Sequence, residues 1–441
     1  MTEWKRTHYC GDMGKTYVGQ TVTLNGWVNR RRDLGQVIFV DLRDRSGIVQ
    51  VVLDPEVLGP EQFALAERLR SEYVISVQGK VMDRPEGQVN VNMKTGEVEL
   101  HVSKLVILSE AKTPPFHIHQ ADDVDESLRL KYRYLHLRSK ELQDTIMLRH
   151  RTVAAVRSYL DGQGFLDIET PILIRSTPEG ARDYIVPSRV HPGEFYALPQ
   201  SPQLFKQLLM IGGFDRYYQI ARCFRDEDLR AERQPEFTQI DVEMSFVDRE
   251  DVMNIMEAMI VHVLAEVKGV KIDTPIPRLS YQEAMDRFGS DKPDTRFGME
   301  IGDVTKHLTQ SEFRVFADAV RAGHVIRGIN VKGGATFTRR QIDQLSEQAV
   351  AMGAKGLMWF SLEENQVRSP IAKFLSDAEM QAIQAELDGD VGDLLLLVAG
   401  PWDLVSEVLG RLRLALGKEL GLIDDDLYNL LWVVDWPLLV Y

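Results

Sequence analysis

The segment from Phe214 to Phe246 constrains the fold of this 441-residue chain most strongly, because apolar and polar residues alternate on both sides of a charged stretch. Its sequence, FDRYYQIARCFRDEDLRAERQPEFTQIDVEMSF, predicts two strands joined by a loop of about ten residues. Successive side chains of a strand point to opposite faces, so the second strand has one apolar and one polar face. The apolar face, predicted to be core, carries Ile240, Val242, Met244 and Phe246, and the polar face carries Gln239, Asp241 and Glu243.

The loop between these strands is rich in arginine. A guanidinium group offers forked donors that fit phosphate oxygens, so the pattern suits a phosphate ligand. A solvent-facing hairpin explains the pattern equally well, because exposed strand faces are polar too. The residues concerned are Gln219 and Arg225, which share one parity, and the loop residues Glu227, Arg230, Arg233 and Gln234.

A helix is predicted in ALPQSPQLFKQLLMIGG, just before these strands. Ser201 is a suitable N-cap, and Pro202 suits the first helical position. Gln203 and Lys206 are three residues apart, so they share one face of the helix. Lys206 is therefore either the partner of a substrate carboxylate or an ordinary surface lysine.

The N-terminal quarter of the chain predicts a small OB-type barrel of five strands with one helix, Glu61 to Leu69. Arg30, Arg31 and Arg32 end the first strand, and Phe39 lies in the second. These residues either contact phosphates and stack on bases, or form a solvated rim and a core position. The predicted strands are Val22 to Val28, Val37 to Leu42, Ile48 to Leu53, Tyr73 to Val81 and Val98 to Leu108.

A linker is predicted around Pro114, Pro115 and the acidic run Asp122 to Glu126, where the periodicity is interrupted. A second domain begins after it with a helix and the apolar strand Phe165 to Ile168. The core face of that helix is predicted to carry Ile146, Val153, Val156 and Leu160.

Composition excludes several classes of protein. No run of about 18 apolar residues exists and the N-terminus is charged, so we expect a cytoplasmic protein that does not enter a membrane. Cys10 and Cys223 are too few for a zinc site or a disulfide framework. The net charge of -14 means that an RNA partner must be met by a local basic surface.

Two of these segments resemble motifs of class II aminoacyl-tRNA synthetases. CFRDEDLRAERQPEFTQID is similar to motif 2, and GFLDIETPIL, which contains Pro171, is similar to motif 1. The resemblance implies that Arg225 contacts the ATP α-phosphate and the amino acid carboxylate as a catalytic residue. It also implies that Glu227 and Gln234 contact ATP, and that motif 1 forms a homodimer interface.

Two further segments, QSPQLFKQ and STPEGARDY, resemble the aspartate-binding segments of bacterial-type aspartyl-tRNA synthetases. The resemblance implies that Glu179 faces the substrate ammonium with the help of Asp241, and that Lys206 binds the side-chain carboxylate beside Gln203. The implied activity is ATP-dependent formation of aspartyl-adenylate and transfer of the aspartyl group to the 3′ end of tRNA(Asp).

GWVNRRRDLG and FVDLRDRSGIVQ are similar to the anticodon-binding barrel of the same family. The implied contacts to anticodon bases are Arg32, Phe39, Gln50 and Glu97. Leu34 resembles the residue of enzymes restricted to the aspartate tRNA. After FGSDKPD, the segments GGATFTRRQIDQL, GAKGLMWF and SPIAKFL are similar to an insertion domain of bacterial-type enzymes.

Class II enzymes also carry a third motif, and we expect that this chain ends before it. LALG, Leu414 to Gly417, resembles its start but is predicted to be an ordinary helix, and LLWVVDWPLLVY is predicted to be a strand inside a sheet. The ligands of Mg²⁺ are then expected in the absent part, with none in this chain. A tRNA- or aspartate-binding protein without activity, or a paralogue with another product, is the alternative to an active ligase.

The expected fold class is α+β, with an OB-type barrel, an incomplete antiparallel-sheet catalytic domain and an inserted α+β domain. The expected division of the chain is 1–108 for the barrel, 109–140 for a linker, 141–294 for the first part of the catalytic domain, 295–424 for the insertion and 425–441 for the return to the catalytic domain.

Overall fold

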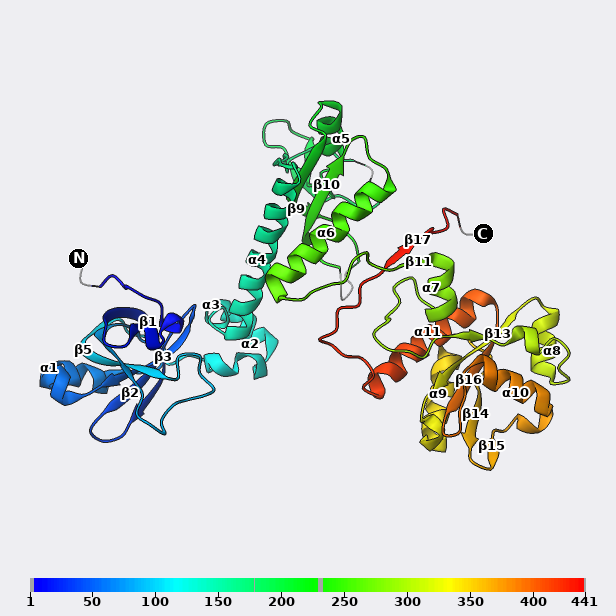
Figure 1. Ribbon diagram of the computed structural model, residues 1–441. Coiled ribbons are helices and arrows are strands. Elements are labelled where there is room, and N and C mark those ends of the chain that lie inside the picture. The colour runs from blue at the N-terminus through cyan, green and yellow to red at the C-terminus, as the bar shows by residue number, and fades with distance from the viewer. Residues whose placement is uncertain (1–3, 178, 229–232, 440–441) are drawn as a thin grey trace. The chain divides into compact units, whose positions relative to one another are not determined.

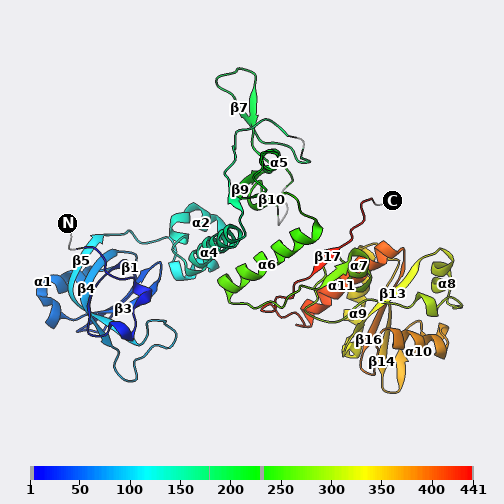
Figure 2. The ribbon, with the colours of Figure 1, turned by 45° about the horizontal axis from the view of Figure 1, so that its top comes forward.

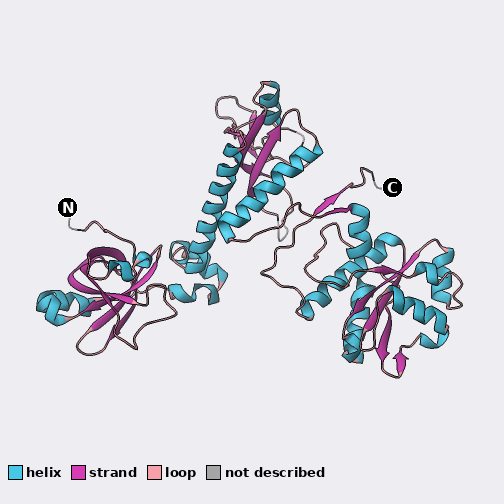
Figure 3. Cartoon of the chain, viewed as in Figure 1, coloured by secondary structure: helices cyan, strands magenta, loops and turns pink. Residues whose placement is uncertain are grey.

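The computed structural model describes residues 4–177, 179–228 and 233–439. The chain forms two compact units, Met1–Ala154 and Ala155–Tyr441. Both units combine helices with strands that pair mainly antiparallel (Figures 1 and 3), so the predicted α+β class is confirmed. Within the described residues, no helix combines the length and apolar character that crossing a bilayer requires.

The first unit contains a closed five-stranded barrel in the order β1-β2-β3-β5-β4. Apolar residues at alternate positions of every strand fill its interior, which is why the predicted strands are recovered. The helix begins earlier than the predicted start at Glu61, because Asp54 caps it. A kink at Gly59 and Pro60 interrupts the helical spacing of apolar residues, so the first turn was not predicted. The elements are β1 (Thr21–Asp33), β2 (Ile38–Asp44), β3 (Gly47–Leu53), α1 (Pro55–Arg68), β4 (Val74–Asp83) and β5 (Val98–Ser109).

The segment predicted as a linker is not an unstructured connection. It holds a 3-10 helix (Ile118–Asp123), α2 (Glu126–Lys131) and α3 (Arg133–His136), which pack around Phe116 and Leu135. Just after α3, Arg138 donates to Glu72 (2.7 Å), a carboxylate that Arg43 also binds at 2.8 Å. This buried cluster fixes the helical segment to the barrel, and its loss would leave an unpaired buried charge.

The second unit begins in α4 (Lys140–Gly162) and contains the predicted pair of strands. β9 (Arg216–Phe224) and β10 (Glu236–Met244) are antiparallel, and β6 (Leu166–Asp167) pairs with β9 in parallel. α6 (Arg249–Lys268) and the end of α4 pack on one face of this sheet (Figure 1). A hairpin of β7 (Ile185–Pro187) and β8 (Phe195–Ala197) projects nearby (Figure 2).

Several core predictions for this sheet are wrong. Phe246 is 97% exposed, because β10 ends at Met244 and a positive φ of 57° takes Phe246 out of the strand alternation. Ile240 is exposed on the edge strand, and Ile146 is exposed because the core contacts only the last turns of α4. The strand predicted from Phe165 to Ile168 pairs over two residues only.

A second sheet, in the order β12-β13-β16-β14-β15, follows later in the unit. Its central strand reads LLLLVAG, and alternate leucines face two separate cores, so both faces must be covered by helices (Figure 3). The strands are β12 (Gly302–Asp303), β13 (Val325–Val331), β14 (Met358–Glu363), β15 (Gln366–Arg368) and β16 (Leu394–Gly400), and the helices are α8 (Arg314–Arg321), α9 (Arg339–Ala351), α10 (Asp377–Glu386) and α11 (Trp402–Glu419).

The second sheet is joined to the rest of the unit by β11 (Arg278–Ser280) and α7 (Tyr281–Phe288) on one side and by β17 (Trp432–Val434) on the other. β11 and β17 pair in parallel. LALG lies inside α11, which confirms the prediction of an ordinary helix. The strand predicted inside a sheet, LLWVVDWPLLVY, is wrong in extent, because among its described residues only the three of β17 pair, with β11 on one side. Residues 440 and 441 lie outside the described part.

Candidate functional site

The register of β9 and β10 shows which side chains share the polar face. Asp241 lies opposite Gln219, and Gln239 lies opposite Ala221, so these residues point to one side of the sheet. The other side carries Val242 and Met244, which pack against α4 and α6. The predicted division into a polar and a core face is therefore confirmed for the second half of β10, from Asp241 to Met244.

Lys206 connects a helix to this polar face. It lies on α5 (Gln203–Ile211), which packs against β9 and β10, and its Nζ donates to Asp241 Oδ1 at 2.9 Å. A second carboxylate, Glu243, is 3.3 Å from the same Nζ. Burial by itself lowers the pKa of Lys206, but the hydrogen bonds and charges of Asp241 and Glu243 outweigh it and raise the pKa.

Asp241 retains an acceptor that the chain does not use. The residue is 7% exposed, and its Oδ1 is bound to Lys206. The nearby carboxylate, after burial, raises the pKa of Tyr217, whose hydroxyl donates to Gln219. Oδ2 itself accepts no hydrogen bond among the described residues. A buried carboxylate oxygen without a donor is costly, so it marks a position where a ligand donor is favourable.

The loop 176–184 is held beside this site by α5 and the residues before it. Ser201 does not cap α5 as predicted, because the helix begins at Gln203 and the Ser201 hydroxyl donates to Glu179 Oε2 at 2.7 Å. Gln200 donates to the carbonyl of Ala181 and to Asp183, and it accepts from the amide of Ala181. The sequence did not predict a role for Gln200, because this residue does not belong to an apolar or polar periodicity.

The predicted motif 2 arginine follows β9 directly. The amide of Arg225 donates to the carbonyl of Pro235 (2.9 Å), and its guanidinium lies 4.9 Å from the ring centre of Phe237. Burial, followed by the charge of Asp241, raises the pKa of Cys223 to about 11. Arg225 and Glu179 also act on that thiol.

The loop after β9 is described only in part. Glu227 accepts from Arg233 at 3.1 Å, and Gln234 is exposed. Arg230, which belongs to the predicted phosphate-binding loop, lies outside the described residues. At the start of the loop, the amide of Asp226 donates to the carbonyl of Arg182, which joins the loop to segment 176–184.

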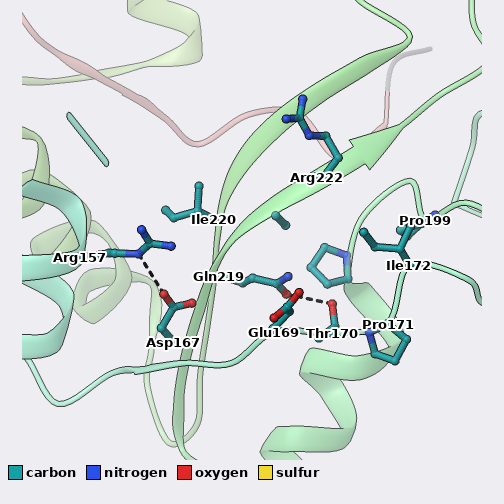
Figure 4. Close-up of a pocket in the computed structure, with 12 residues that line it drawn as sticks. Arg157, Asp167, Glu169, Thr170, Pro171, Ile172, Pro199, Gln219, Ile220 and Arg222 are labelled. Carbon is teal, nitrogen blue, oxygen red and sulfur yellow. Dashed lines mark hydrogen bonds and ion pairs between the residues drawn. The ribbon is translucent and has the colours of Figure 1, made fainter. Parts of the chain in front are cut away.

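A cavity of about 470 Å³ lies where β6 leaves β9 (Figure 4). Gln219 reaches it and accepts from Thr170 at 2.9 Å. The ion pair between Arg157 and Asp167 forms another part of its wall. None of the predicted aspartate- or ATP-binding residues lines it, so this cavity is adjacent to the candidate site and separate from it.

On the barrel, three of the four predicted base-contacting residues lie together. Arg32 is directly opposite Phe39 and donates to Gln50 at 2.8 Å. Gln50 in turn donates to Glu99 (2.8 Å). Phe39 is half-buried, which contradicts the interpretation of Phe39 as a core position.

Arg32, Phe39 and Gln50 line a cavity of about 280 Å³, whereas Glu97 is paired with Lys15 at 2.8 Å and does not line it. Leu34, which the sequence also singles out, lines the same cavity. The remaining lining residues, Arg84, Gln88 and Asn90, were not predicted, because they lie outside the periodic strands.

Metal ligands cannot be assigned here. Within 4–177, 179–228 and 233–439, no group of three or more histidine, cysteine or acidic side chains has a geometry that holds an ion. We therefore name no Mg²⁺ ligand among these residues and assign no step of a reaction to the metal.

Two protein families match the chain. The family described as tRNA synthetases class II (D, K and N) matches residues 125–440, and the family described as OB-fold nucleic acid binding domain matches residues 22–108. The second match covers nearly the whole of the closed barrel, which confirms the predicted OB fold.

Curated relatives are similar over almost the whole chain. An aspartate–tRNA ligase of Bacillus licheniformis is 57% identical over 438 residues, which are 99% of this chain and 74% of the relative. An aspartate–tRNA(Asp/Asn) ligase of Bacillus subtilis is 58% identical over 436 residues, which are 98% of this chain and 74% of that protein.

Solved structures resemble the fold at lower identity. The asparaginyl-tRNA synthetase from Pyrococcus horikoshii complexed with asparaginyl-adenylate has a TM-score of 0.55 and 22% identity, covering 93% of this chain and 95% of that one. The aspartyl tRNA synthetase from Entamoeba histolytica has a TM-score of 0.53 and 17% identity, covering 93% and 90%. The identities and family matches together show that this chain belongs to the bacterial-type aspartyl-tRNA synthetases of class II.

Proposed function

We propose that this chain activates L-aspartate with ATP and transfers the aspartyl group to tRNA(Asp). The observation that carries the proposal is the unused buried oxygen of Asp241 beside the ammonium of Lys206. An acceptor and a cation side by side suit a ligand that carries both an ammonium group and a carboxylate. The family supports ATP as the second substrate.

In this proposal the substrate ammonium donates to Asp241 Oδ2 and to Glu179. Lys206 has three donors and uses two on Asp241 and Glu243, so one remains for the side-chain carboxylate of aspartate. Gln203, at the start of the same helix, adds a neutral partner. Acidic groups at one end and a lysine at the other select an acidic amino acid in one orientation.

Arg225 is the proposed catalytic residue, with Glu227 and Gln234 as further ATP contacts. An oxygen of the aspartate α-carboxylate attacks the α-phosphorus of ATP, and the bond to pyrophosphate breaks. Arg225 stabilises the charge that develops on the α-phosphate oxygens. A terminal ribose hydroxyl of tRNA then attacks the carbonyl carbon of aspartyl-adenylate, and AMP leaves.

The barrel cavity is the proposed site for an anticodon base. Phe39 offers a ring for stacking, and Arg32 and Gln50 offer donors and acceptors to base edges. Glu97 stays a proposed contact outside that cavity, and Leu34, which lines it, is the proposed determinant of the choice of tRNA. The homodimer, the cytoplasmic location and the use of Mg²⁺ with ATP also stay predictions.

The test is aspartate-dependent exchange of pyrophosphate into ATP by the 441-residue chain, with asparagine as the control amino acid. Exchange with aspartate alone is expected. Absence of exchange with either amino acid would overturn the proposed activity.

A binding protein without activity is the second candidate, and the comparisons do not favour it, since the relatives are named ligases. Calorimetric titration with aspartate separates the two. Binding of aspartate without exchange would overturn the proposed activity and leave the proposed site intact, whereas no binding would overturn both.

A further inference from the structure

The second sheet contains a cavity that the proposed ligase reaction does not use. Its volume is about 540 Å³, which is within the range of sites for small organic ligands. It lies at one end of the three inner strands, where β13 begins, β16 ends and β14 begins. Loops at the ends of strands, held in place by a rigid sheet, are a common place for ligand sites.

Small residues keep this cavity open, because their side chains are too short to fill it. The larger walls are the buried Leu357 and the half-buried Met358 and Leu404. The lining therefore offers apolar contact to a ligand body. The small residues are Ala319, Ala322, Gly353, Gly356, Ala399 and Gly400.

The polar residues of the lining favour an anionic group. Lys355 is exposed and, within the described part of the chain, has no carboxylate partner. The ring of His324 likewise has no partner among those residues. The one acidic residue of the lining, Asp318, is bound by Arg314 (3.5 Å) and Arg321 (2.5 Å).

The charge pattern distinguishes a carboxylate from a phosphate. The lining contains no arginine, so it lacks the forked donor that phosphate sites use. One ammonium and one imidazole match a single negative charge.

We propose that this cavity binds a small monocarboxylate with an apolar body, with the carboxylate at Lys355 and His324 and the body against Leu357, Met358 and Leu404. The proposal does not rest on the ligase activity. It assigns a ligand site to the part of the chain for which the sequence indicates no function.

The experiment titrates the 441-residue chain with octanoate, followed by calorimetry and by the methyl signals of chain labelled at methionine. Met358 is assigned by the variant Met358→Leu. Saturable binding with a shift of the Met358 methyl signal is expected. Octanol, which has the same body without the charge, is expected to bind about tenfold more weakly, as for loss of one charge-assisted hydrogen bond.

Two variants test the location. Gly356→Leu is expected to weaken octanoate binding at least tenfold, because an added Cβ there meets nothing within 4 Å and its side chain occupies open space. Lys355→Met is expected to weaken it about tenfold. Lys418→Met, which changes an exposed lysine near the end of α11, is the matched control and keeps the parent affinity.

The thermal unfolding midpoint of each variant shows whether it folds. Absence of saturable octanoate binding, or parent affinity in a folded Gly356→Leu variant, overturns the site. Equal affinity for octanol and octanoate, or parent affinity for octanoate in Lys355→Met, overturns the proposed recognition of a carboxylate. Displacement of octanoate by inorganic phosphate overturns the choice of a carboxylate.

Discussion

Lys206 and Asp241 form an ion pair in which each side chain keeps hydrogen-bonding capacity that the pair does not use. Lys206 has a side-chain exposure of 12% and retains one donor, while Asp241 retains one buried acceptor. An ion pair formed only for stability would place those groups in contact with other donors and acceptors of the chain. At the scale of single residues, the pair therefore has the properties of a binding site for a zwitterion.

Replacement of Asp241 by asparagine tests that interpretation. The amide keeps the shape of the side chain but removes the charge offered to the substrate ammonium, so we expect the KM for aspartate to rise about 10- to 100-fold, the equivalent of about 1.5–3 kcal/mol. The measurement is aspartate-dependent pyrophosphate exchange at saturating ATP. Glu364→Gln, a change at an exposed residue in the turn between β14 and β15, is the control. An unchanged KM in Asp241→Asn would contradict the assignment.

The pH dependence of stability tests the partners of Lys206. The pKa of Lys206 is raised in the folded chain, so its stabilising contribution is fully present below the ordinary lysine value of 10.5 and is lost as the pH rises through the folded pKa. The urea midpoint of the parent should therefore exceed that of Lys206→Met by a constant amount from pH 8 to about 10, and the difference should shrink at higher pH. A difference that grows with pH would show that the pair does not stabilise the folded chain.

At the scale of elements, the alternation of apolar and polar residues predicted the strands. It did not predict the positions of side chains that are fixed by residues distant in the sequence. The strands of the barrel and β9 and β10 were predicted to within a few residues, because each buries one face. The N-cap prediction for Ser201 failed because its hydroxyl binds Glu179, a partner 22 residues earlier in the sequence. The same holds for Gln200 and for the lining residues Arg84 and Asn90, which no local pattern marks.

Gln200 gives a prediction at this scale, because it makes three hydrogen bonds to Ala181 and Asp183. We expect Gln200→Ala to loosen the loop 176–184, raise the KM for aspartate and speed tryptic cleavage after the exposed Arg182. Cleavage is followed by mass spectrometry. Gln207→Ala, on the exposed side of α5, should leave both quantities at the parent values. Parent cleavage rates in Gln200→Ala would show that other contacts hold the loop.

At the scale of the second unit, the entry to the second sheet and the exit from it are held together. β11 pairs with β17, and α11 packs on α7. Arg413 of α11 donates to the carbonyls of Phe297, Gly298 and Met299, and its guanidinium lies 4.0 Å from the ring centre of Phe297. Burial lowers the pKa of Arg413 to about 10. The second sheet is therefore a tightly attached part of its unit.

The close packing of α7 against α11 depends on two glycines, Gly289 and Gly410. Gly410 lies inside α11, where glycine costs about 1 kcal/mol relative to alanine, so a packing reason is required. A Cβ on Gly410 would lie 2.5 Å from the carbonyl oxygen of Gly289, which ends α7 with a positive φ of 64°. The carbonyl oxygen is a backbone atom and the Cβ is attached directly to the backbone, so no rotation of a side chain can relieve the contact.

We therefore expect Gly410→Ala to destabilise the second unit by about 1–3 kcal/mol, because α7 and α11 must separate, even though alanine is the better helix former. The measurement is urea unfolding followed by tryptophan fluorescence. Gly298→Ala is the matched control, since a Cβ there meets nothing within 4 Å. An increase of stability in Gly410→Ala would mean that helix propensity outweighs the contact, and that the two helices do not pack as closely in solution as these distances require.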